Sequence, residues 1–160
     1  MRFKMGFALV CALVGALMSV GGSSGSVKPQ TIRLLEIDNS FAGIGGYSLN
    51  SNRPPGPGEG FAFGGIVYKW ASAKRGAAVG HLAAMCTVVT KTVALCNGAI
   101  FLPGGKLELL TPSNLNNDTA PTDIAIVGGT GAYVGAQGYM HSTTIGGPDS
   151  NKSSLVIHLT

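Results

Sequence analysis

A glycine-rich stretch near the end of the chain is the first candidate for chemistry. Five of its glycines lie within eleven residues, directly behind the apolar run 124–127: Gly128, Gly129, Gly131, Gly135 and Gly138. A glycine-rich turn between a strand and a helix can bind a pyrophosphate, because backbone N–H groups then point at the phosphate. A nucleotide site of this kind needs a following helix, but only 29 residues follow Gly131 and residues 139–145 favour a strand. The stretch therefore indicates a turn between two strands.

Two cysteines are the second candidate. Cys86 and Cys96 lie in β-prone runs on either side of the polar tip 90–92. In a hairpin centred on Lys91 they face each other directly, with Cβ atoms about 4.5–5.5 Å apart, close to the spacing that a disulfide requires. The chain has three cysteines, and Cys11 lies in an expected signal at 1–26. The two cysteines that remain after export are an even number in an oxidising compartment, which also favours pairing. We predict a Cys86–Cys96 disulfide, with free thiols as the alternative.

The histidines and serines form no further catalytic pattern. His81, His141 and His158 lie on three different expected strands, and none has a His or Cys partner at a metal-like spacing. No serine stands in a Gly-x-Ser-x-Gly turn, so a hydrolase has no support. We expect structural roles for these histidines and no metal site, a triad assembled only in space being the alternative.

The first 26 residues have the features of a secretory signal. Arg2 and Lys4 give a positive start, residues 7–20 form an apolar core of fourteen residues, and small residues follow at 21–26. The apolar core is short for a transmembrane helix. We expect a signal peptide at 1–26, a mature domain at 27–160, a secreted protein and no stable membrane insertion after cleavage. An uncleaved N-terminal anchor is the alternative, because no Ala-x-Ala motif is present.

The composition fits one globular domain. Hydrophobic residues make up 45% of the 160 residues and charged residues 11%, which excludes a disordered, highly charged chain. Lys and Arg exceed Asp and Glu by 11 to 7, but only by 9 to 7 once Arg2 and Lys4 leave with the signal. No run of Lys or Arg remains, so nucleic acid is not an expected partner.

Short β-prone segments separated by turn residues fill the mature chain. Eight are expected to be strands: residues 31–37, 61–70, 79–88, 93–102, 106–110, 123–127, 138–145 and 153–160. Residues 38–40 are expected to break the first strand, a long loop to follow at 43–60, and Gly64 and Gly65 to mark a bulge. A polar loop is expected at 111–122, and no amphipathic helix follows the signal. This spacing predicts an all-β barrel or sandwich, and a closed eight-stranded barrel holds side chains or one small ligand.

The glycine-rich stretch also carries a family resemblance. Residues 128–138 resemble the Gly-Gly-Thr/Ser-Gly-x-aromatic-x-x-Ala-x-Gly signature of the allene oxide cyclase-like and dirigent-like barrels, with Thr130 and Tyr133 at its third and sixth positions. Residues 79–86 are similar to the family's valine-glycine strand that ends in a cysteine. Residues 35–38 look like the acidic first strand of the plant cyclases. The resemblance covers residues 31–160.

This resemblance implies a calycin-like, eight-stranded antiparallel β-barrel, often a homotrimer, with an apolar cavity open at one end and no cofactor. A dirigent-like protein would bind and orient a hydrophobic small molecule there without oxidising it. The first alternative is an isomerase or cyclase of the allene oxide cyclase type, acting on an unstable fatty-acid epoxide or a related reactive intermediate. The second is a structural or carrier barrel without catalysis.

The cyclase resemblance assigns two catalytic residues. Glu36 falls where the cyclases place a cavity carboxylate, and Asp38 where they place a polar side chain, an Asn, near a bound water. A buried carboxyl group could steer a proton or stabilise a developing cation. Cys86 matches their cavity cysteine, although pairing with Cys96 would remove a thiol role. The structural alternative is a solvated Glu36 paired with Arg33 or a neighbour.

The dirigent resemblance assigns a different set, since it calls for carboxylates and tyrosines around the cavity. Asp123 is the candidate carboxylate, and Tyr68, Tyr133 and Tyr139 are candidates to stack on an aromatic ligand. For Tyr133 the alternative role is to pack the signature turn.

Overall fold

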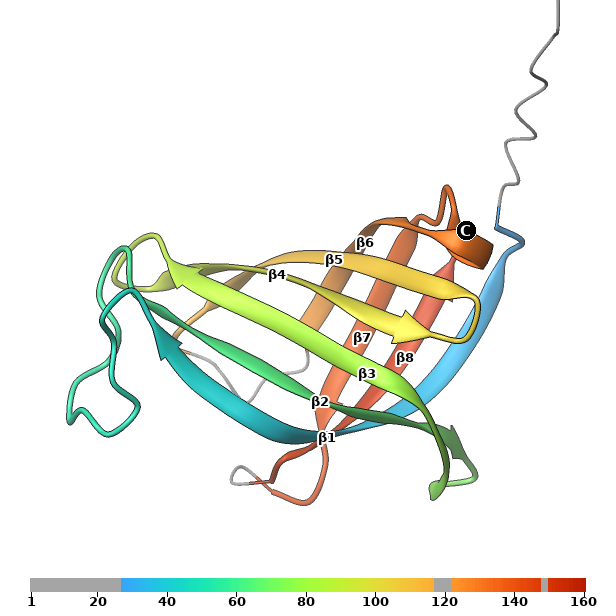
Figure 1. The fold of residues 1–160 in the computed structure, drawn as a ribbon, viewed down its shortest axis with the longest axis horizontal. Helices are drawn as coiled ribbons and strands as arrows, with labels where there is room; N and C mark the ends of the chain where they lie inside the picture. Colours follow the sequence, from blue (N-terminus) through green and yellow to red (C-terminus); the bar gives the residue numbers. More distant parts are fainter. Residues whose placement is uncertain (1–26, 117–121, 148–149) are drawn as a thin grey trace, which may run out of the picture.

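The chain folds into a closed barrel of eight antiparallel strands, in which each strand pairs with the next and the last with the first (Figure 1). This computed structural model describes residues 27–116, 122–147 and 150–160. The strands are β1 Gln30–Ile44, β2 Gly60–Ala71, β3 Lys74–Val88, β4 Val93–Leu102, β5 Gly105–Asn114, β6 Thr122–Gly129, β7 Gly138–Thr144 and β8 Lys152–Leu159. The predicted all-β, eight-stranded antiparallel barrel is confirmed. The signal predicted at 1–26 lies outside the described residues.

Large apolar side chains on the inward-facing rows of the strands fill one end of the barrel. Ile100, Leu107, Met140, Leu155 and Ile157 are almost completely buried there. Each lies on the inward-facing row of its strand, because successive residues of a strand point to opposite faces. The short 3-10 helix η1, Gly131–Tyr133, covers this end between β6 and β7. Within the described residues no helix is long and apolar enough to cross a membrane.

The first strand is longer than the sequence predicted, because a bulge carries it past residue 38. Asp38 pairs with Gly65 and Ser40 with Gly64, which leaves Asn39 as an extra residue on β1. The expected break at 38–40 is therefore a bulge inside β1, opposite the glycines to which the bulge had been assigned. A Cβ on Gly65 would lie 2.5 Å from the Ile37 carbonyl oxygen, so glycine permits this close pairing.

The bulge changes which residues face inward. Glu36 and Asp38 share the inner face before it, and Phe41, opposite Phe63, takes the inner face after it. An extra residue shifts the two-residue alternation by one and so re-aims every later side chain.

The glycine-rich stretch is the connection between two strands, as predicted. The chain leaves β6, passes through η1 and enters β7. Gly131 has φ +61°, and a Cβ there would meet the Gly104 carbonyl at 2.0 Å. Tyr133 packs against the core from this connection.

The cysteine hairpin is confirmed. Cys86 on β3 pairs directly with Cys96 on β4. A disulfide joins them across a Cα–Cα distance of 4.0 Å. The adjoining β5 continues to Asn114, so the loop expected from residue 111 begins later.

Candidate ligand cavity

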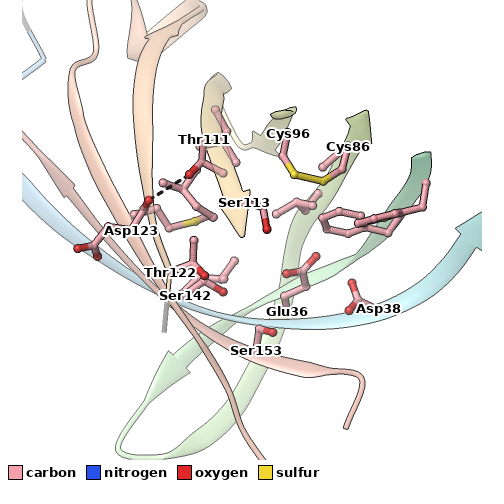
Figure 2. Close-up of a pocket in the computed structure, with 18 of the residues that line it drawn as sticks. Glu36, Asp38, Cys86, Cys96, Thr111, Ser113, Thr122, Asp123, Ser142 and Ser153 are labelled. Carbon is pink, nitrogen blue, oxygen red and sulfur yellow. Dashed lines mark hydrogen bonds between the residues drawn. A yellow bond between two sulfur atoms is a disulfide. The ribbon is translucent and has the colours of Figure 1, made fainter. Parts of the chain in front are cut away.

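The end of the barrel opposite η1 is hollow. A cavity of about 500 Å³ lies there, bounded mainly by inward-facing residues of the strands (Figure 2). This volume is within the range of small-molecule sites, about 300–1,000 Å³. The β1–β2 loop and the β3–β4 hairpin extend from this end of the barrel (Figure 1).

Small and polar residues on the inward rows explain why this end is empty. Along β8 the inward row reads Ser153, Leu155, Ile157, and along β7 it runs from Met140 to Ser142. Ser113 on β5 and Thr122 on β6 occupy corresponding positions at the hollow end. From the filled end to the hollow end, the inward-facing side chains therefore change from large apolar ones to small hydroxyl-bearing ones within a few residues.

Glu36 points into this cavity from β1 (Figure 2). It is only 4% exposed, and it is not the solvated strand residue of the structural alternative. Burial, the charge of Asp38 and a hydrogen bond with Asp38 together raise the pKa of Glu36 to about 8, and burial contributes most. Near neutral pH the Glu36 carboxyl group is therefore largely protonated and able to donate a hydrogen bond.

Asp38 lies on the same face, two residues along the strand. Burial raises its pKa, while a hydrogen bond with Glu36 acts in the opposite direction. One oxygen of each carboxyl group, Glu36 Oε1 and Asp38 Oδ1, is buried and has no hydrogen-bond partner within the described part of the chain. The two carboxyl groups titrate as a pair. Two carboxyl oxygens without partners, on one side of an empty cavity, are suited to meet a polar group of a ligand.

The backbone beneath this pair is fixed by a loop that the sequence did not single out. Asn151 accepts a hydrogen bond from the Asp38 amide at 2.9 Å, and its side chain donates to the Asp38 carbonyl at 2.9 Å. These two contacts hold the bulge, and so the direction of Asp38, against the β7–β8 loop.

Aromatic rings form the wall beside the carboxyl pair. Phe61 and Phe63 line the cavity. Phe41 stacks against both, with ring centroids 5.4 Å and 6.4 Å away. The Cys86–Cys96 disulfide lies in the adjoining wall (Figure 2). The alternation Phe61-x-Phe63 in an expected strand was the available signal for this wall, but it does not say which face of the sheet the rings occupy.

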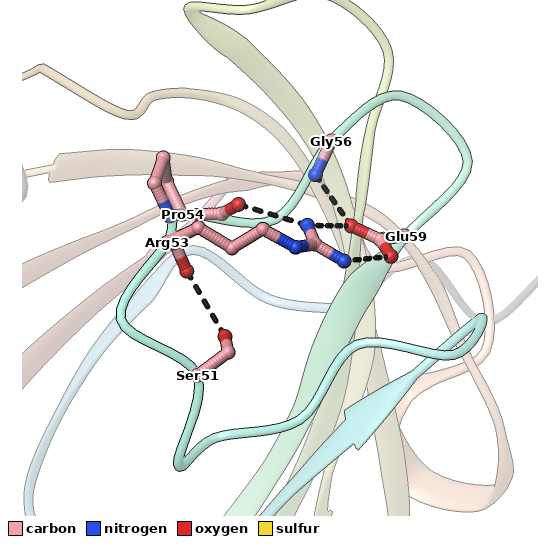
Figure 3. Close-up of polar contacts among 5 residues, drawn as sticks. All are labelled: Ser51, Arg53, Pro54, Gly56 and Glu59. Carbon is pink, nitrogen blue, oxygen red and sulfur yellow. Dashed lines mark hydrogen bonds and ion pairs between the residues drawn. The ribbon is translucent and has the colours of Figure 1, made fainter.

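The loop from β1 to β2 is held by one ion pair (Figure 3). Arg53 donates to both carboxylate oxygens of Glu59 at 2.6 Å, and the Gly56 amide donates to the same carboxylate at 2.7 Å. The hydrogen bonds from Arg53 and Gly56 lower the pKa of Glu59 to about 2. Backbone hydrogen bonds from Gly58 to Val88 and from Val88 to Glu59 tie the loop to the β3–β4 hairpin. The long loop is therefore ordered beside the hollow end.

The structure does not bring the other predicted ligand-binding side chains into the cavity. Tyr68 lies outside, with the Arg75 guanidinium 5.2 Å from its ring centroid. Tyr139 stacks on His158 at 4.8 Å outside the barrel, and Tyr133 lies in η1. Asp123 contributes to the cavity wall, but its carboxylate points away from Glu36 and contacts His141 Nδ1 at 2.7 Å (Figure 2). Of the predicted residues, the cavity thus unites Glu36 and Asp38, with Cys86 and Cys96 beside them.

The described residues contain no candidate metal site. No group of three or more His, Cys, Asp or Glu side chains lies close enough there to hold a metal ion.

Solved structures with the same architecture include proteins that handle small organic molecules. A pyocyanin demethylase superposes with a TM-score of 0.64 at 21% identity, covering 82% of this chain and 100% of that one. A pterocarpan synthase dirigent protein gives 0.65 at 16% identity, covering 84% and 96%. The Diels-Alderase AbmU from Streptomyces koyangensis gives 0.59 at 13%, covering 83% and 70%. The chain has the dirigent-like barrel fold. No protein-family model matches the sequence, and no curated protein matches it.

Proposed function

We propose that this dirigent-like barrel binds and orients a hydrophobic small molecule in its hollow end, without a cofactor. The observation that carries the proposal is the contrast on the inner face, where a barrel packed with leucine and isoleucine opens into a cavity of about 500 Å³. Phenyl rings would contact the flat face of the ligand. Protonated Glu36 would donate a hydrogen bond to an oxygen of the ligand, and the opposite hydroxyl groups would fix its orientation.

A cavity-filling substitution tests this proposal. Ser153→Leu would place an isobutyl group inside the cavity, and Ser154→Leu would place the same group outside, because neighbouring strand residues face opposite sides. The probe is N-phenyl-1-naphthylamine, a neutral aromatic compound that fluoresces in apolar surroundings. We expect saturable binding to the unmodified protein and to Ser154→Leu, and at least about tenfold weaker binding to Ser153→Leu. Equal binding by all three proteins would refute the cavity as the site.

A second candidate is an isomerase or cyclase of the allene oxide cyclase type, which the raised pKa of Glu36 favours. A neutral carboxyl group at pH 7 can donate a proton as bonds rearrange in a reactive substrate. Glu36→Gln keeps the size and one hydrogen-bond donor but removes the transferable proton. If Glu36 acts in this way, the substitution will lower the rate of epoxide cyclisation by about 100-fold or more while binding of the probe is kept. Unchanged cyclisation would remove Glu36 from the mechanism. Binding without cyclisation by either protein would leave the orienting or carrier function.

We also propose export and self-association. Export after removal of residues 1–26 is supported by the apolar segment and the disulfide. A homotrimer is supported by the exposed apolar side chains on the outer face of β3, β4 and β5: Met85, Leu95, Phe101 and Leu110. N-terminal sequencing of the protein in the medium tests export, and light scattering tests the mass. A protein retained in cells, or a monomer at micromolar concentration, would contradict the respective proposal.

A further inference from the structure

A second hollow lies on the outside of the barrel, across β1, β2 and β8. It has a volume of about 520 Å³ and is bounded by the β2–β3 turn and the β7–β8 loop. Leu35, Ile37, Trp70 and Ile145 supply its apolar surface, and Arg75 and Lys152 supply its charges. We call these six residues the outer groove. None of them belongs to the inner cavity.

The floor of the outer groove is apolar and recessed. Leu35 faces outward, since its neighbours Leu34 and Glu36 face the interior, yet it is only 4% exposed. It lies between Tyr68 on β2 and Ser154 on β8. A leucine buried on the outer face of a barrel marks a depression in that face and not a flat sheet surface.

The charges of the outer groove are all of one sign. No carboxylate lines it, and within the described residues neither Arg75 nor Lys152 forms an ion pair. The Arg75 guanidinium lies over the Tyr68 ring, 5.2 Å from its centroid. The inner cavity has the reverse arrangement, with two carboxyl groups and no Lys or Arg among its lining residues. The two hollows therefore differ in the sign of the charged groups that line them.

We propose that the outer groove binds a small amphipathic anion. Its apolar part lies on Leu35, Ile37 and Trp70, and its carboxylate or other anionic group lies between Arg75 and Lys152. Guanidinium and ammonium groups bind such anions through charge-assisted hydrogen bonds. The apolar contacts contribute in proportion to the area buried. The site does not overlap the inner cavity, so it stands independently of the function proposed above.

The single tryptophan of the chain, Trp70, lies in the groove and reports its occupancy directly. The full mature protein is titrated with octanoate, and its tryptophan emission is followed. Octanol and octylammonium serve as neutral and cationic probes of equal chain length. We expect a saturable change with octanoate, binding at least about tenfold weaker for octanol, and no saturation with octylammonium.

Variants separate the groove from the cavity. Arg75→Gln and Lys152→Gln are each expected to weaken octanoate binding about tenfold. Lys74→Gln, beside Arg75 at the start of β3 but outside the groove, and Ser153→Leu, inside the cavity, should leave octanoate binding unchanged. Far-ultraviolet circular dichroism checks folding, and Lys152→Glu gives an independent test, because it should shift the preference from octanoate toward octylammonium.

Several results would overturn the proposal. One is an equal response to octanol and octanoate, and another is unchanged octanoate binding after loss of both cations. Loss of octanoate binding in Ser153→Leu would place the anion in the inner cavity. A lower molecular mass of Arg75→Gln in light scattering would mean that a second copy of the chain occupies the groove.

Discussion

The two ends of the barrel are built by the same eight strands but differ in the side chains that point inward. At the η1 end the inward residues are large, apolar and fully buried, as Leu107 and Ile157 show. At the other end serines, threonines and two carboxyl groups, together with two phenylalanines, surround a cavity of about 500 Å³. The comparison shows that the same strands can fill one end of the barrel with large apolar side chains and leave a cavity of about 500 Å³ at the other.

The largest expected effect comes from removing a side chain at the filled end. Leu107→Ala should lower the free energy of unfolding by about 3–4 kcal/mol, because Leu107 is fully buried and its neighbours on several strands cannot collapse into the gap. Phe61→Ala, at the wall of the existing cavity, should cost about half as much, since it enlarges a space that is already open. Urea unfolding measures both. Equal losses would contradict the division into a packed and a hollow end.

Reduction of the disulfide should have the next largest effect. The Cys86–Cys96 bond closes a short loop with a sequence separation of 10, so its loss should destabilise the fold by roughly 3 kcal/mol. The double variant Cys86→Ser/Cys96→Ser in urea unfolding tests this, with the reduced unmodified protein as a comparison. A variant as stable as the oxidised protein would show that the strand pairing alone fixes this wall of the cavity.

The pH dependence of stability should follow Glu36. Its pKa rises from 4.5 to about 8 on folding, so the folded protein binds more protons than the unfolded chain between these values. With respect to this group, stability should therefore be greatest below about pH 4.5. It should fall by up to about 1.4 kcal/mol per pH unit as the pH rises to 8. Thermal unfolding from pH 5 to 8 measures this slope, and Glu36→Gln should flatten it. An unchanged slope in Glu36→Gln would assign the titration to another group.

The smallest effect on stability is expected from filling the cavity. Ser153→Leu should change the free energy of unfolding by less than about 1 kcal/mol, because added methyl groups occupy free space without overpacking. A loss above about 2 kcal/mol in urea unfolding would mean that the hollow end cannot accept the side chain.

The sequence was sufficient for the strands but not for the faces they present. Alternating β-prone runs and glycine turns predicted eight strands, and the hairpin around Lys91 placed Cys86 opposite Cys96. The bulge at Asn39 was missed, because it depends on how β1 aligns with Gly64 and Gly65 of another strand. Asn151 was missed since its contact with Asp38 spans 113 residues.

The same limit explains the residues assigned to the cavity. The resemblance to the cyclases assigned Glu36 and Asp38 to the cavity, where the structure places them. Residue type alone could not tell which face of the sheet Tyr68 and Tyr139 occupy. A tyrosine in a strand faces inward or outward according to a register of one residue. The phenylalanine wall and the hydroxyl groups opposite it could be recognised only once the barrel was closed, because they come from strands far apart in the chain.

A ligand in the hollow end can be detected by native mass spectrometry of the protein purified from its producing cells. We expect a small organic molecule bound to the unmodified protein and to Ser154→Leu, and absent from Ser153→Leu. The same bound mass on all three proteins, or on none of them, would contradict a ligand held in the hollow end of the barrel.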